Sequence, residues 1–291
     1  MPGPLVVVDG PFVLYRSFFA LPDSITGLDD QPVNALLGGA NLLLRLIADR
    51  GPRAVVVCFG AEAAAYRTEL YPPYHATRPP VPDALQWQFD HAEEFFDAFG
   101  WSSASDERFE ADDLLGSYAT VEAAARGRTQ IMTGDRDMYQ CADESTTVVF
   151  LKQGSAGFDD VDHAEVVKRY GVPPSLVPDF IALRGDPSDG LPGAPGIGPK
   201  TAAELLSEYG SLEAALEAAP KGKLRPRVAG ALIDNADELR AFKDIATLRS
   251  VDVERPPDRP TDLAGGADAA EALGMRRLAE RLRGASSVSD L

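Results

Sequence analysis

Acidic residues gathered at two turns are the feature of this sequence most suited to chemistry. The segment Phe109–Asp113 carries three carboxylates, and Asp135-Arg136-Asp137 adds two more. Carboxylates crowded together raise one another's pKa unless a cation neutralises them. Their oxygens suit hard divalent ions such as Mg²⁺ or Mn²⁺. A plainer interpretation stays open for each turn, because Asp is also a favoured residue at the start of a helix.

Two more acids and a glycine hairpin follow later in the chain. Asp186 and Asp189 are three residues apart, which places them on the same side of a helical turn. Directly after them comes Gly193-Ala194-Pro195-Gly196-Ile197-Gly198-Pro199-Lys200-Thr201. Glycines let backbone N–H groups approach an anion, the start of a helix is positive, and a lysine adds charge. The pattern therefore predicts a phosphate-binding hairpin.

Composition limits the class of protein. The chain has 291 residues, 45% of them hydrophobic, and a formal net charge of −17. This length suggests one large domain, or one domain with a smaller partner. The acid excess would restrict contact with a polyanion to a few basic patches. One such patch is the run 221–227, which is either a solvated surface or a contact for a DNA backbone.

Cysteines, histidines and the absence of long apolar runs exclude other classes of site. Cys58 and Cys141 are the only cysteines, and we expect both to be reduced. The three histidines, His75, His91 and His163, lack ligand spacing, which argues against a zinc site. No apolar run reaches the roughly 18 residues of a membrane span, and the first residues do not resemble a signal peptide. We therefore expect a cytoplasmic protein that does not contact membranes.

The elements that must position these acids alternate between strands and helices. The patterns predict strands at 5–10, 54–60, 129–133 and 146–151, and helices at 34–50, 86–99 and 113–126. Such alternation predicts an α/β fold with a parallel central sheet and helices on both faces. Sites in such sheets lie at the carboxyl ends of strands, which is where Asp9 and Asp135 fall.

A second region follows from about Val172, where short helices are joined by glycine-rich turns. The predicted helices lie at 179–184, 199–209, 211–219, 228–248 and 270–283, with an extended connector at 254–260. We expect three segments: an α/β core at 1–171 with a proline-rich arch around 71–100, a helical region at 172–255, and a C-terminal connector and helix at 256–291. Residues from Ala285 onward are expected to be disordered.

Taken together, these residues resemble the 5′-nuclease family, meaning the 5′ to 3′ exonuclease domain of bacterial DNA polymerase I and the flap endonucleases. The resemblance extends to about Leu248. It rests on Val8-Asp9-Gly10 with Tyr15-Arg16, on the acidic signatures 109–113, 133–137 and 185–189, and on the hairpin 193–202. It implies a PIN-like nuclease core and a small helical domain with a helix-three-turn-helix motif.

The resemblance implies a metal-dependent phosphodiester hydrolase, both 5′-flap endonuclease and 5′-3′ exonuclease, acting in DNA replication or repair. Its partner would be DNA with a 5′ flap or a 5′ end. Two or more Mg²⁺ or Mn²⁺ ions would activate a water and stabilise the charged phosphate. The ligands that the resemblance assigns are Asp9, Glu110, Asp112, Asp113, Asp135, Asp137, Asp186 and Asp189. A monovalent cation such as K⁺ is a further candidate at the 193–200 hairpin. We expect a stand-alone, monomeric nuclease.

The family's DNA contacts map onto a second set of residues. Arg67 and Arg78 would be catalytic, because arginine offers a scissile phosphate paired hydrogen bonds. The arch residues Tyr74 and His75 would contact DNA, since an aromatic ring can stack on a terminal base. The hairpin residues assigned to DNA binding are Gly196, Gly198, Lys200 and Thr201.

Two positions depart from the family's pattern. The family usually has a lysine where this chain has His75, and an aspartate where this chain has Gly60. The loss at Gly60 leaves open a catalytically silent module that binds branched DNA. A third possibility is an RNA-directed nuclease of the wider superfamily with an acidic site.

Overall fold

The computed structural model describes residues 3–152 and 157–291. The chain divides into two compact units. The first unit comprises Met1–Gly60, Pro79–Gly134 and Val251–Leu291, and the second comprises Ala61–Arg78 and Asp135–Ser250. These units interleave along the chain, unlike the continuous segments 1–171, 172–255 and 256–291 expected from the sequence. The segment boundaries stay a prediction.

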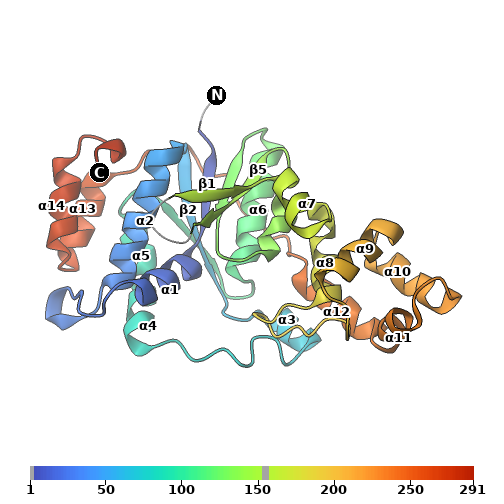
Figure 1. Ribbon diagram of the computed structural model, residues 1–291. Coiled ribbons are helices and arrows are strands. Elements are labelled where there is room, and N and C mark those ends of the chain that lie inside the picture. Colours follow the sequence, from blue (N-terminus) through green and yellow to red (C-terminus); the bar gives the residue numbers. More distant parts are fainter. Residues whose placement is uncertain (1–2, 153–156) are drawn as a thin grey trace. The chain divides into compact units, whose positions relative to one another are not determined.

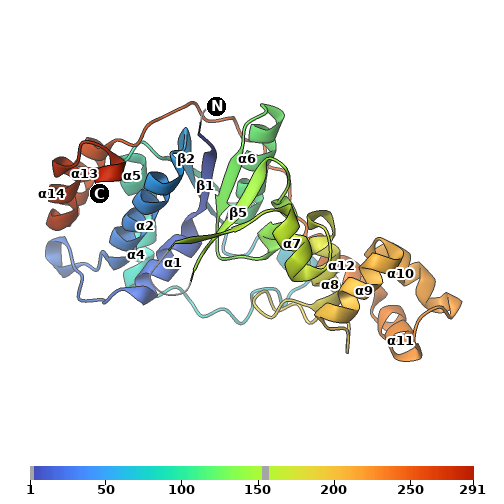
Figure 2. The same ribbon diagram turned by 45° about the horizontal axis from the view of Figure 1, so that its top comes forward.

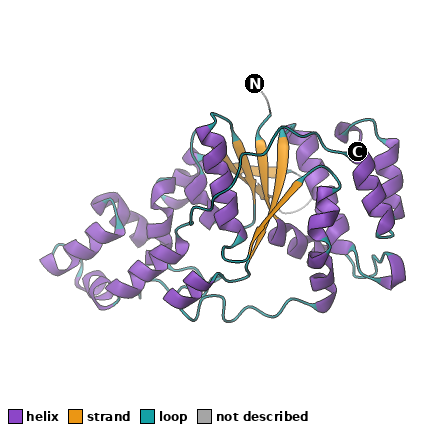
Figure 3. Cartoon of the chain, turned by 180° about the vertical axis from the view of Figure 1, so that it is seen from behind, coloured by secondary structure: helices purple, strands orange, loops and turns teal. Residues whose placement is uncertain are grey.

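The strands form a six-stranded sheet with the order β3-β2-β1-β4-β5-β6. Helices lie on both sides of this sheet (Figure 3). The strands of the first unit are β1 (Leu5–Asp9), β2 (Ala54–Gly60), β3 (Ser102–Asp106) and β4 (Thr129–Met132). β1 pairs in parallel with both β2 and β4, and β2 pairs in parallel with β3. The side chains of β1 and most of β2 are buried, as expected of strands covered on both faces.

Connections between these strands place helices on opposite faces. The chain steps outward from β1 to β2 to β3 and then returns across the sheet to β4. Right-handed crossovers therefore put the helices before β3 on one face and the helix after β3 on the other. The former are α1 (Gly10–Ala20), α2 (Asn34–Arg50), α4 (Asp83–Asp90) and α5 (Ala92–Asp97), and the latter is α6 (Ala111–Ala124).

The second unit contains the antiparallel pair β5 (Thr146–Leu151) and β6 (Phe158–Val161). The central strands pair in parallel, as predicted, and this antiparallel pair lies at the β6 end of the sheet. The six residues 152–157 between the two strands are too few for the crossover that parallel strands need.

Helices make up most of the second unit. They are α3 (Ala65–Leu70), α7 (His163–Tyr170), α8 (Val177–Arg184), α9 (Pro199–Tyr209), α10 (Leu212–Ala218), α11 (Pro226–Asp234) and α12 (Ala236–Ala246), with the 3₁₀ helices η2 (Asp137–Cys141), η3 (Pro174–Leu176) and η4 (Ala219–Lys221). α8, the turns that follow it and α9 supply the predicted helix-turn-helix arrangement, and α9 to α11 lie close to one another in both Figure 1 and Figure 2.

The connector from Val251 is held on the first unit by a buried charge cluster. The Arg53 guanidinium forms an ion pair with Glu122 and donates from Nη1 to the Pro256 carbonyl at 2.8 Å. Arg255 donates from Nε to the same Glu122 carboxylate at 2.9 Å. Side chains of Arg53 and Glu122 are almost completely buried. Breaking such a pair leaves an uncompensated buried charge, so this cluster fixes the connector to the core.

The C-terminal part of the first unit is more structured than the sequence indicated. The predicted helix 270–283 is two helices, α13 (Leu263–Ala272) and α14 (Arg276–Gly284), separated at Gly274 with φ +80°. After them η5 (Val288–Asp290) contacts α2, in a segment expected to be disordered. η1 (Leu28–Asp30) lies in the connection between α1 and α2. Among the described residues no helix is both long and apolar enough to cross a membrane.

Candidate metal centre and DNA-contact residues

In the first unit, Asp9 ends β1 and begins α1. Its Oδ1 accepts a hydrogen bond from the Phe12 backbone N–H at 2.9 Å, which caps the helix. Its Oδ2 accepts from the Thr133 hydroxyl at 2.8 Å. Asp9 and Thr133 are both buried and lie at the carboxyl ends of neighbouring strands. The sequence therefore positioned Asp9 correctly, and Thr133 fixes the orientation of its carboxylate.

Glu110, Asp112 and Asp113 lie at the start of α6. The Asp113 side chain is fully buried, and its Oδ2 accepts from the Glu110 backbone N–H at 3.2 Å. Asp112 is half-buried. Burial and then the negative charges of Asp9 and Asp112 raise the pKa of the Cys58 thiol well above its ordinary value. Asp9 and Asp112 thus act on the same thiol, at the carboxyl end of the parallel pair β1 and β2.

Gly60 lies against the backbone of this acidic turn. A Cβ atom at position 60 would be 2.6 Å from the Phe109 carbonyl oxygen and 2.7 Å from the Ala111 nitrogen. Real Cβ contacts almost never come that close, and a backbone neighbour cannot move aside as a flexible side chain can. Gly60 therefore allows the end of β2 to approach residues 109–111. An aspartate would require the backbone here to shift.

In the second unit, Asp135 and Asp137 form a local turn at the start of η2. The Asp135 Oδ1 accepts from the Asp137 backbone N–H at 2.8 Å. Asp137 is buried. Burial of the Tyr170 side chain is the main reason that its pKa is raised to about 12. The charges of Asp137 and Tyr139 raise this pKa further, whereas those of Arg184 and Arg136 lower it.

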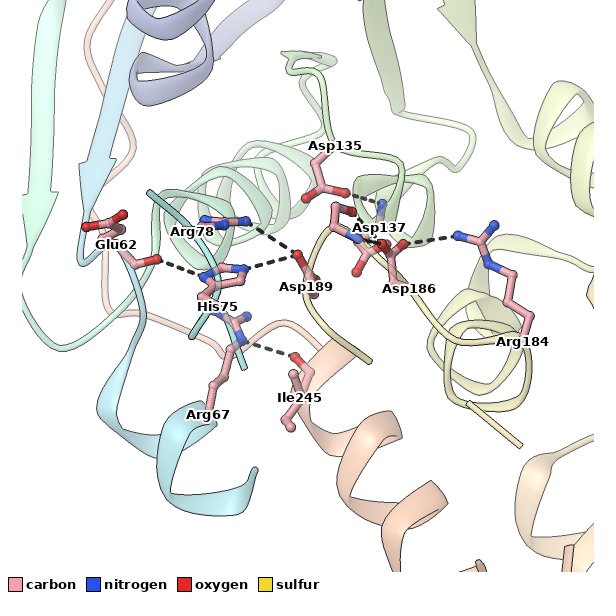
Figure 4. Close-up of polar contacts among 11 residues, drawn as sticks. Glu62, Arg67, His75, Arg78, Asp135, Asp137, Arg184, Asp186, Asp189 and Ile245 are labelled. Carbon is pink, nitrogen blue, oxygen red and sulfur yellow. Dashed lines mark hydrogen bonds and ion pairs between the residues drawn. The ribbon is translucent and has the colours of Figure 1, made fainter. Parts of the chain in front are cut away.

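Asp186 and Asp189 are also in the second unit, and both are buried (Figure 4). The Ser188 backbone N–H donates to Asp186 Oδ1 at 2.9 Å, and the Ser188 hydroxyl donates to the same oxygen. Asp186 Oδ2 accepts from Arg184 Nη2 at 3.1 Å. Gly185 and Leu191 close the turn: Asp186 and Leu191 exchange two backbone hydrogen bonds of 2.8 Å.

Asp189 is held by residues of the proline-rich segment. Its Oδ1 lies 3.1 Å from His75 Nε2 and 3.4 Å from Arg78 Nη2 (Figure 4). His75 Nδ1 donates to the Glu62 carbonyl at 3.0 Å, and the Asp189 carbonyl accepts from the His75 backbone N–H at 3.2 Å. His75 has φ +54°, which is uncommon for a residue other than glycine. Its ring therefore joins the 62–78 segment to a predicted metal ligand.

Two residues predicted to contact DNA lie in packed surroundings. Arg67 is 3% exposed, and its Nε donates to the Ile245 carbonyl of α12 at 3.0 Å. Tyr74 is 4% exposed and stacks on His75 with ring centroids 3.8 Å apart. These contacts give Arg67 and Tyr74 roles in packing that the sequence did not predict. Arg78, in contrast, has a side chain that is 40% exposed.

The glycine hairpin has the backbone that the sequence predicts. Gly196 has φ +78°, and the Arg227 guanidinium lies over it, 2.9 Å from where a Cβ would stand. Gly198 precedes Pro199 at the first turn of α9 and leaves open space where a Cβ would stand. Lys200 is 91% exposed at the start of the same helix. This end of α9 offers backbone N–H groups and an exposed cation for phosphate contact.

The acids of both units supply oxygen donors, which is the chemistry that Mg²⁺ or Mn²⁺ requires. Within residues 3–152 and 157–291, however, no three His, Cys, Asp or Glu side chains are grouped so that they could hold a metal ion. The second unit holds two buried acids in one short turn, Asp186 and Asp189.

Three partners of these acids were missed in the sequence: Thr133, Ser188 and Arg184. Thr133 directly follows β4, the strand beside Asp9. Arg184 and Ser188 each stand two residues from Asp186. That spacing is a usable signal, because an acid in a turn commonly bonds groups two residues away.

Two family models match the chain. The model for the 5′-3′ exonuclease N-terminal resolvase-like domain matches residues 4–171, and the model for the 5′-3′ exonuclease C-terminal SAM fold matches residues 172–262. The 5′-3′ exonuclease of Mycobacterium tuberculosis is 37% identical over 312 residues, covering 97% of this chain and 98% of that protein. The 5′-3′ exonuclease of Streptomyces coelicolor is also 37% identical, over 291 residues, with 93% and 95% covered.

DNA polymerase I of Mycobacterium bovis is 35% identical over 256 residues, covering 87% of this chain. The match spans only 28% of that polymerase.

Solved structures with a similar fold include two nucleases at 16% identity. The T5 5′-exonuclease with bound divalent zinc ions has a TM-score of 0.67, covering 96% of this chain and 97% of that one. The catalytic core of Rad2 in complex with a DNA substrate also has a TM-score of 0.67, with 97% and 92% covered. At these identities the likeness shows a shared fold. Because the family models cover residues 4–262 and the exonuclease relatives match over nearly their whole length, the chain belongs to the 5′-3′ exonuclease family.

Proposed function

We propose that this protein is a structure-specific 5′ nuclease that hydrolyses DNA at a 5′ flap or a free 5′ end with divalent ions. Family membership carries the proposal, together with one observation in the structure. The Asp9 carboxylate, at the carboxyl end of β1, accepts a hydrogen bond at 2.8 Å from the hydroxyl of Thr133, at the carboxyl end of the neighbouring strand β4. Ligand sites in such sheets lie at this edge.

The acids of both units have assigned roles in this proposal. In the first unit the ligands would be Asp9, Glu110, Asp112 and Asp113, and in the second unit Asp135, Asp137, Asp186 and Asp189. Bound Mg²⁺ or Mn²⁺ would make an attacking hydroxide available at neutral pH and stabilise charge on the phosphate. Thr133 fixes one face of the Asp9 carboxylate. Such a fixed orientation lets the other face serve as a ligand.

The residues predicted to contact DNA differ in how exposed their side chains are. Arg78 is the stronger candidate for a phosphate contact, because it is 40% exposed and its guanidinium already meets a carboxylate oxygen. Arg67 and Tyr74 would support the segment from within. The hairpin residues Gly196 and Lys200 would contact the backbone of the duplex, as would Gly198 and Thr201.

Gly60 no longer favours a silent DNA-binding module. The backbone of residues 109–111 occupies the space that a side chain at 60 would need. A glycine here allows the end of β2 to lie against the backbone of residues 109–111, which carries the acidic turn. We therefore favour an active enzyme without a carboxylate at position 60.

The test uses purified protein and a duplex with a labelled 5′ flap. We expect cleavage near the flap junction with Mn²⁺ or Mg²⁺ and none with excess chelator. Binding of the flap substrate without metal-dependent cleavage would favour the silent module instead.

A competition assay addresses the RNA alternative. Flap DNA and a structured RNA of the same length, each with its own label, are mixed at equal concentration. We expect the DNA to be consumed first, and preferential cleavage of the RNA would contradict the DNA assignment. Monomeric action, a cytoplasmic location and a K⁺ ion at the hairpin stay predictions from the sequence.

A further inference from the structure

The helix α14 concentrates positive charge in an otherwise acidic protein. Its nine residues include four arginines and one acid, Glu280, whereas the whole chain has a formal net charge of −17. The buried side chains of α14 are Leu278, Ala279 and Leu282, so the charged residues share the opposite, exposed face. We call this surface the basic face of α14, and its arginines are Arg276, Arg277, Arg281 and Arg283.

Packing within the first unit holds the basic face in place. α14 lies beside α13 in both Figure 1 and Figure 2. The turn between these helices contacts the connection between α1 and α2, since a Cβ atom at Gly274 would be 2.5 Å from the Leu28 nitrogen. The Arg281 guanidinium donates a hydrogen bond to Asn41 Oδ1 of α2. α14 also lies beyond residues 4–262, so the match to the family models gives it no role.

Two arginines of the basic face carry charge that no acid compensates. In the part of the chain that the structure describes, neither Arg276 nor Arg277 forms an ion pair. Arg283, by contrast, pairs with Asp268 and Glu271 of α13. Arg276 and Arg277 also stand in the first turn of α14, where the helix dipole disfavours cations. Helix stability therefore does not explain these two residues, which indicates a role in binding.

A phosphate backbone is the partner that the basic face fits. Guanidinium groups bind phosphates through paired hydrogen bonds, and the positive start of a helix adds to the attraction. Arg276 and Arg281 are separated by about 7.5 Å along the helix axis, which is close to two nucleotide steps of a strand at about 3.4 Å each. α14 contains no aromatic ring on which the bases of a single strand could stack. The chemistry therefore favours a duplex over a single strand.

We propose that the basic face of α14 contacts the phosphate backbone of the duplex part of the DNA substrate. The inference rests on the proposed function, in which the protein acts on DNA at a 5′ flap or a 5′ end. It gives the first unit a phosphate-contact surface of its own, in addition to the hairpin predicted for the second unit. Arg276 and Arg277 each contact a phosphate, whereas Arg283 keeps its pairing with the acids of α13.

Binding of DNA without cleavage tests the inference. The full-length protein is kept in excess chelator, and the fluorescence anisotropy of a labelled blunt duplex is followed at several salt concentrations. Each phosphate contact contributes about 0.9 to the slope of log affinity against log salt concentration. We expect Arg276→Gln and Arg277→Gln each to lower this slope by about 0.9 and to weaken binding about twofold to fivefold, the scale of one exposed ion pair.

Two further variants separate a local contact from an effect of net charge. Arg240→Gln removes an exposed guanidinium that pairs with Glu213 and Asp237 in the second unit, and should leave the slope unchanged. Glu280→Gln removes the one acid of the basic face and should strengthen duplex binding about twofold. All of the substituted side chains are exposed, and circular dichroism checks that each variant is folded.

Three outcomes would overturn the inference. One is an unchanged slope in both Arg276→Gln and Arg277→Gln, which would leave an acidic protein as the partner to seek. Another is an equal loss of slope in Arg240→Gln, because net charge alone would then explain the effect. The third is a loss seen only with a labelled single strand of the same sequence, which would contradict the assignment to duplex DNA.

Cleavage by the wild type separates this inference from the proposed function. If the wild type cleaves flap DNA with Mn²⁺ while both arginine variants keep the wild-type slope, the role of the basic face alone is wrong. If the wild type neither binds nor cleaves DNA, the proposed function fails, and the inference fails with it.

Discussion

The two acidic groups of this protein stabilise buried carboxylates in different ways. In the first unit, Asp9 and Asp113 accept hydrogen bonds from backbone N–H groups and from the Thr133 hydroxyl. In the second unit, Asp186 and Asp189 face the cationic or polar side chains of neighbouring residues. Neutral donors orient a carboxylate without compensating its charge, whereas an arginine compensates it. We expect a lower affinity for divalent ions where an arginine stays beside the carboxylate.

A third buried carboxylate shows that pairing with arginine does not by itself mark a metal ligand. Glu122 is enclosed by Arg53 and Arg255 on the first unit and carries no role in the predicted site. Glu122 therefore shows how a carboxylate paired with arginines behaves when its role is only structural. The difference lies in the surroundings: Asp186 and Asp189 share one short turn, whereas Glu122 lies between the side chains of Arg53 and Arg255.

The largest effect should come from the first acidic group. Asp112→Asn removes a charge beside Asp9 while keeping the size of the side chain. We expect the rate of flap cleavage to fall on the order of a thousandfold, the scale seen when a preorganised electrostatic group is lost. Thermal unfolding should stay within a few degrees of the wild type. Cleavage at the wild-type rate would remove Asp112 from the metal site.

The next effect concerns stability. Glu122→Gln leaves the buried Arg53 with only the exposed carboxylate of Asp258 as a counter-charge, and we expect the free energy of unfolding to fall by about 3 kcal/mol. Chemical denaturation measures it. Mn²⁺ binding to the folded variant should match that of the wild type. This result would show that Glu122 is a structural residue, unlike the acids predicted to bind metal.

The same residue predicts a dependence on pH. Burial alone would raise the pKa of Glu122, but hydrogen bonds and charges from Arg53 and Arg255 outweigh it, so the pKa lies below its ordinary value. The stabilisation is therefore complete above the unfolded pKa of about 4.3 and is lost as pH falls through the lower folded value. Denaturation below pH about 4 should show this loss in the wild type. A loss of equal size in Glu122→Gln would contradict the assignment.

A smaller loss is expected at the end of β2. Gly60→Asp restores the acid that the family usually has, but its Cβ would meet backbone atoms at 2.6 to 2.7 Å. We expect destabilisation of about 2 kcal/mol, the usual cost of overpacking, with no gain in Mn²⁺ affinity. Gly60→Ala is the control, because it adds the Cβ without the charge. Tighter Mn²⁺ binding in Gly60→Asp would show that the missing acid matters more than the close approach.

The smallest effect tests the orientation of Asp9. Thr133→Val keeps the shape of a buried side chain and removes the hydroxyl that donates to Asp9 at 2.8 Å. Loss of a hydrogen-bond partner to a metal ligand typically costs about tenfold in metal affinity. We expect this loss in a titration of the protein with Mn²⁺. An unchanged Mn²⁺ affinity would show that the hydroxyl of Thr133 does not support a metal ligand.

Local sequence pattern predicted the elements that carry the site where side-chain periodicity is strong. β2, β5, α2 and α9 begin and end where expected, because each joins an apolar run to a clear boundary such as Gly51 or Pro199. β3 was missed, since Ser102–Asp106 is polar and only half-buried. Predicted helices 86–99 and 228–248 are each two helices, with changes of direction at His91 and Asn235 that no glycine or proline marks.

In the candidate site, too, the sequence predicted local features and missed contacts between distant segments. Local motifs identified the acids, because their spacing within each turn is visible in the chain. The contact of His75 with Asp189 joins residues 114 positions apart, which a single sequence cannot reveal. Arg67 was misleading for the same reason: its partner is a carbonyl of α12, far along the chain.

One measurement tests the central claim that both acidic groups hold divalent ions. Crystals of the protein are soaked with Mn²⁺ at increasing concentration, and anomalous scattering locates the metal. We expect one peak beside Asp9 and Asp112 and another beside Asp186 and Asp189. No peak beside either group would contradict the proposed function.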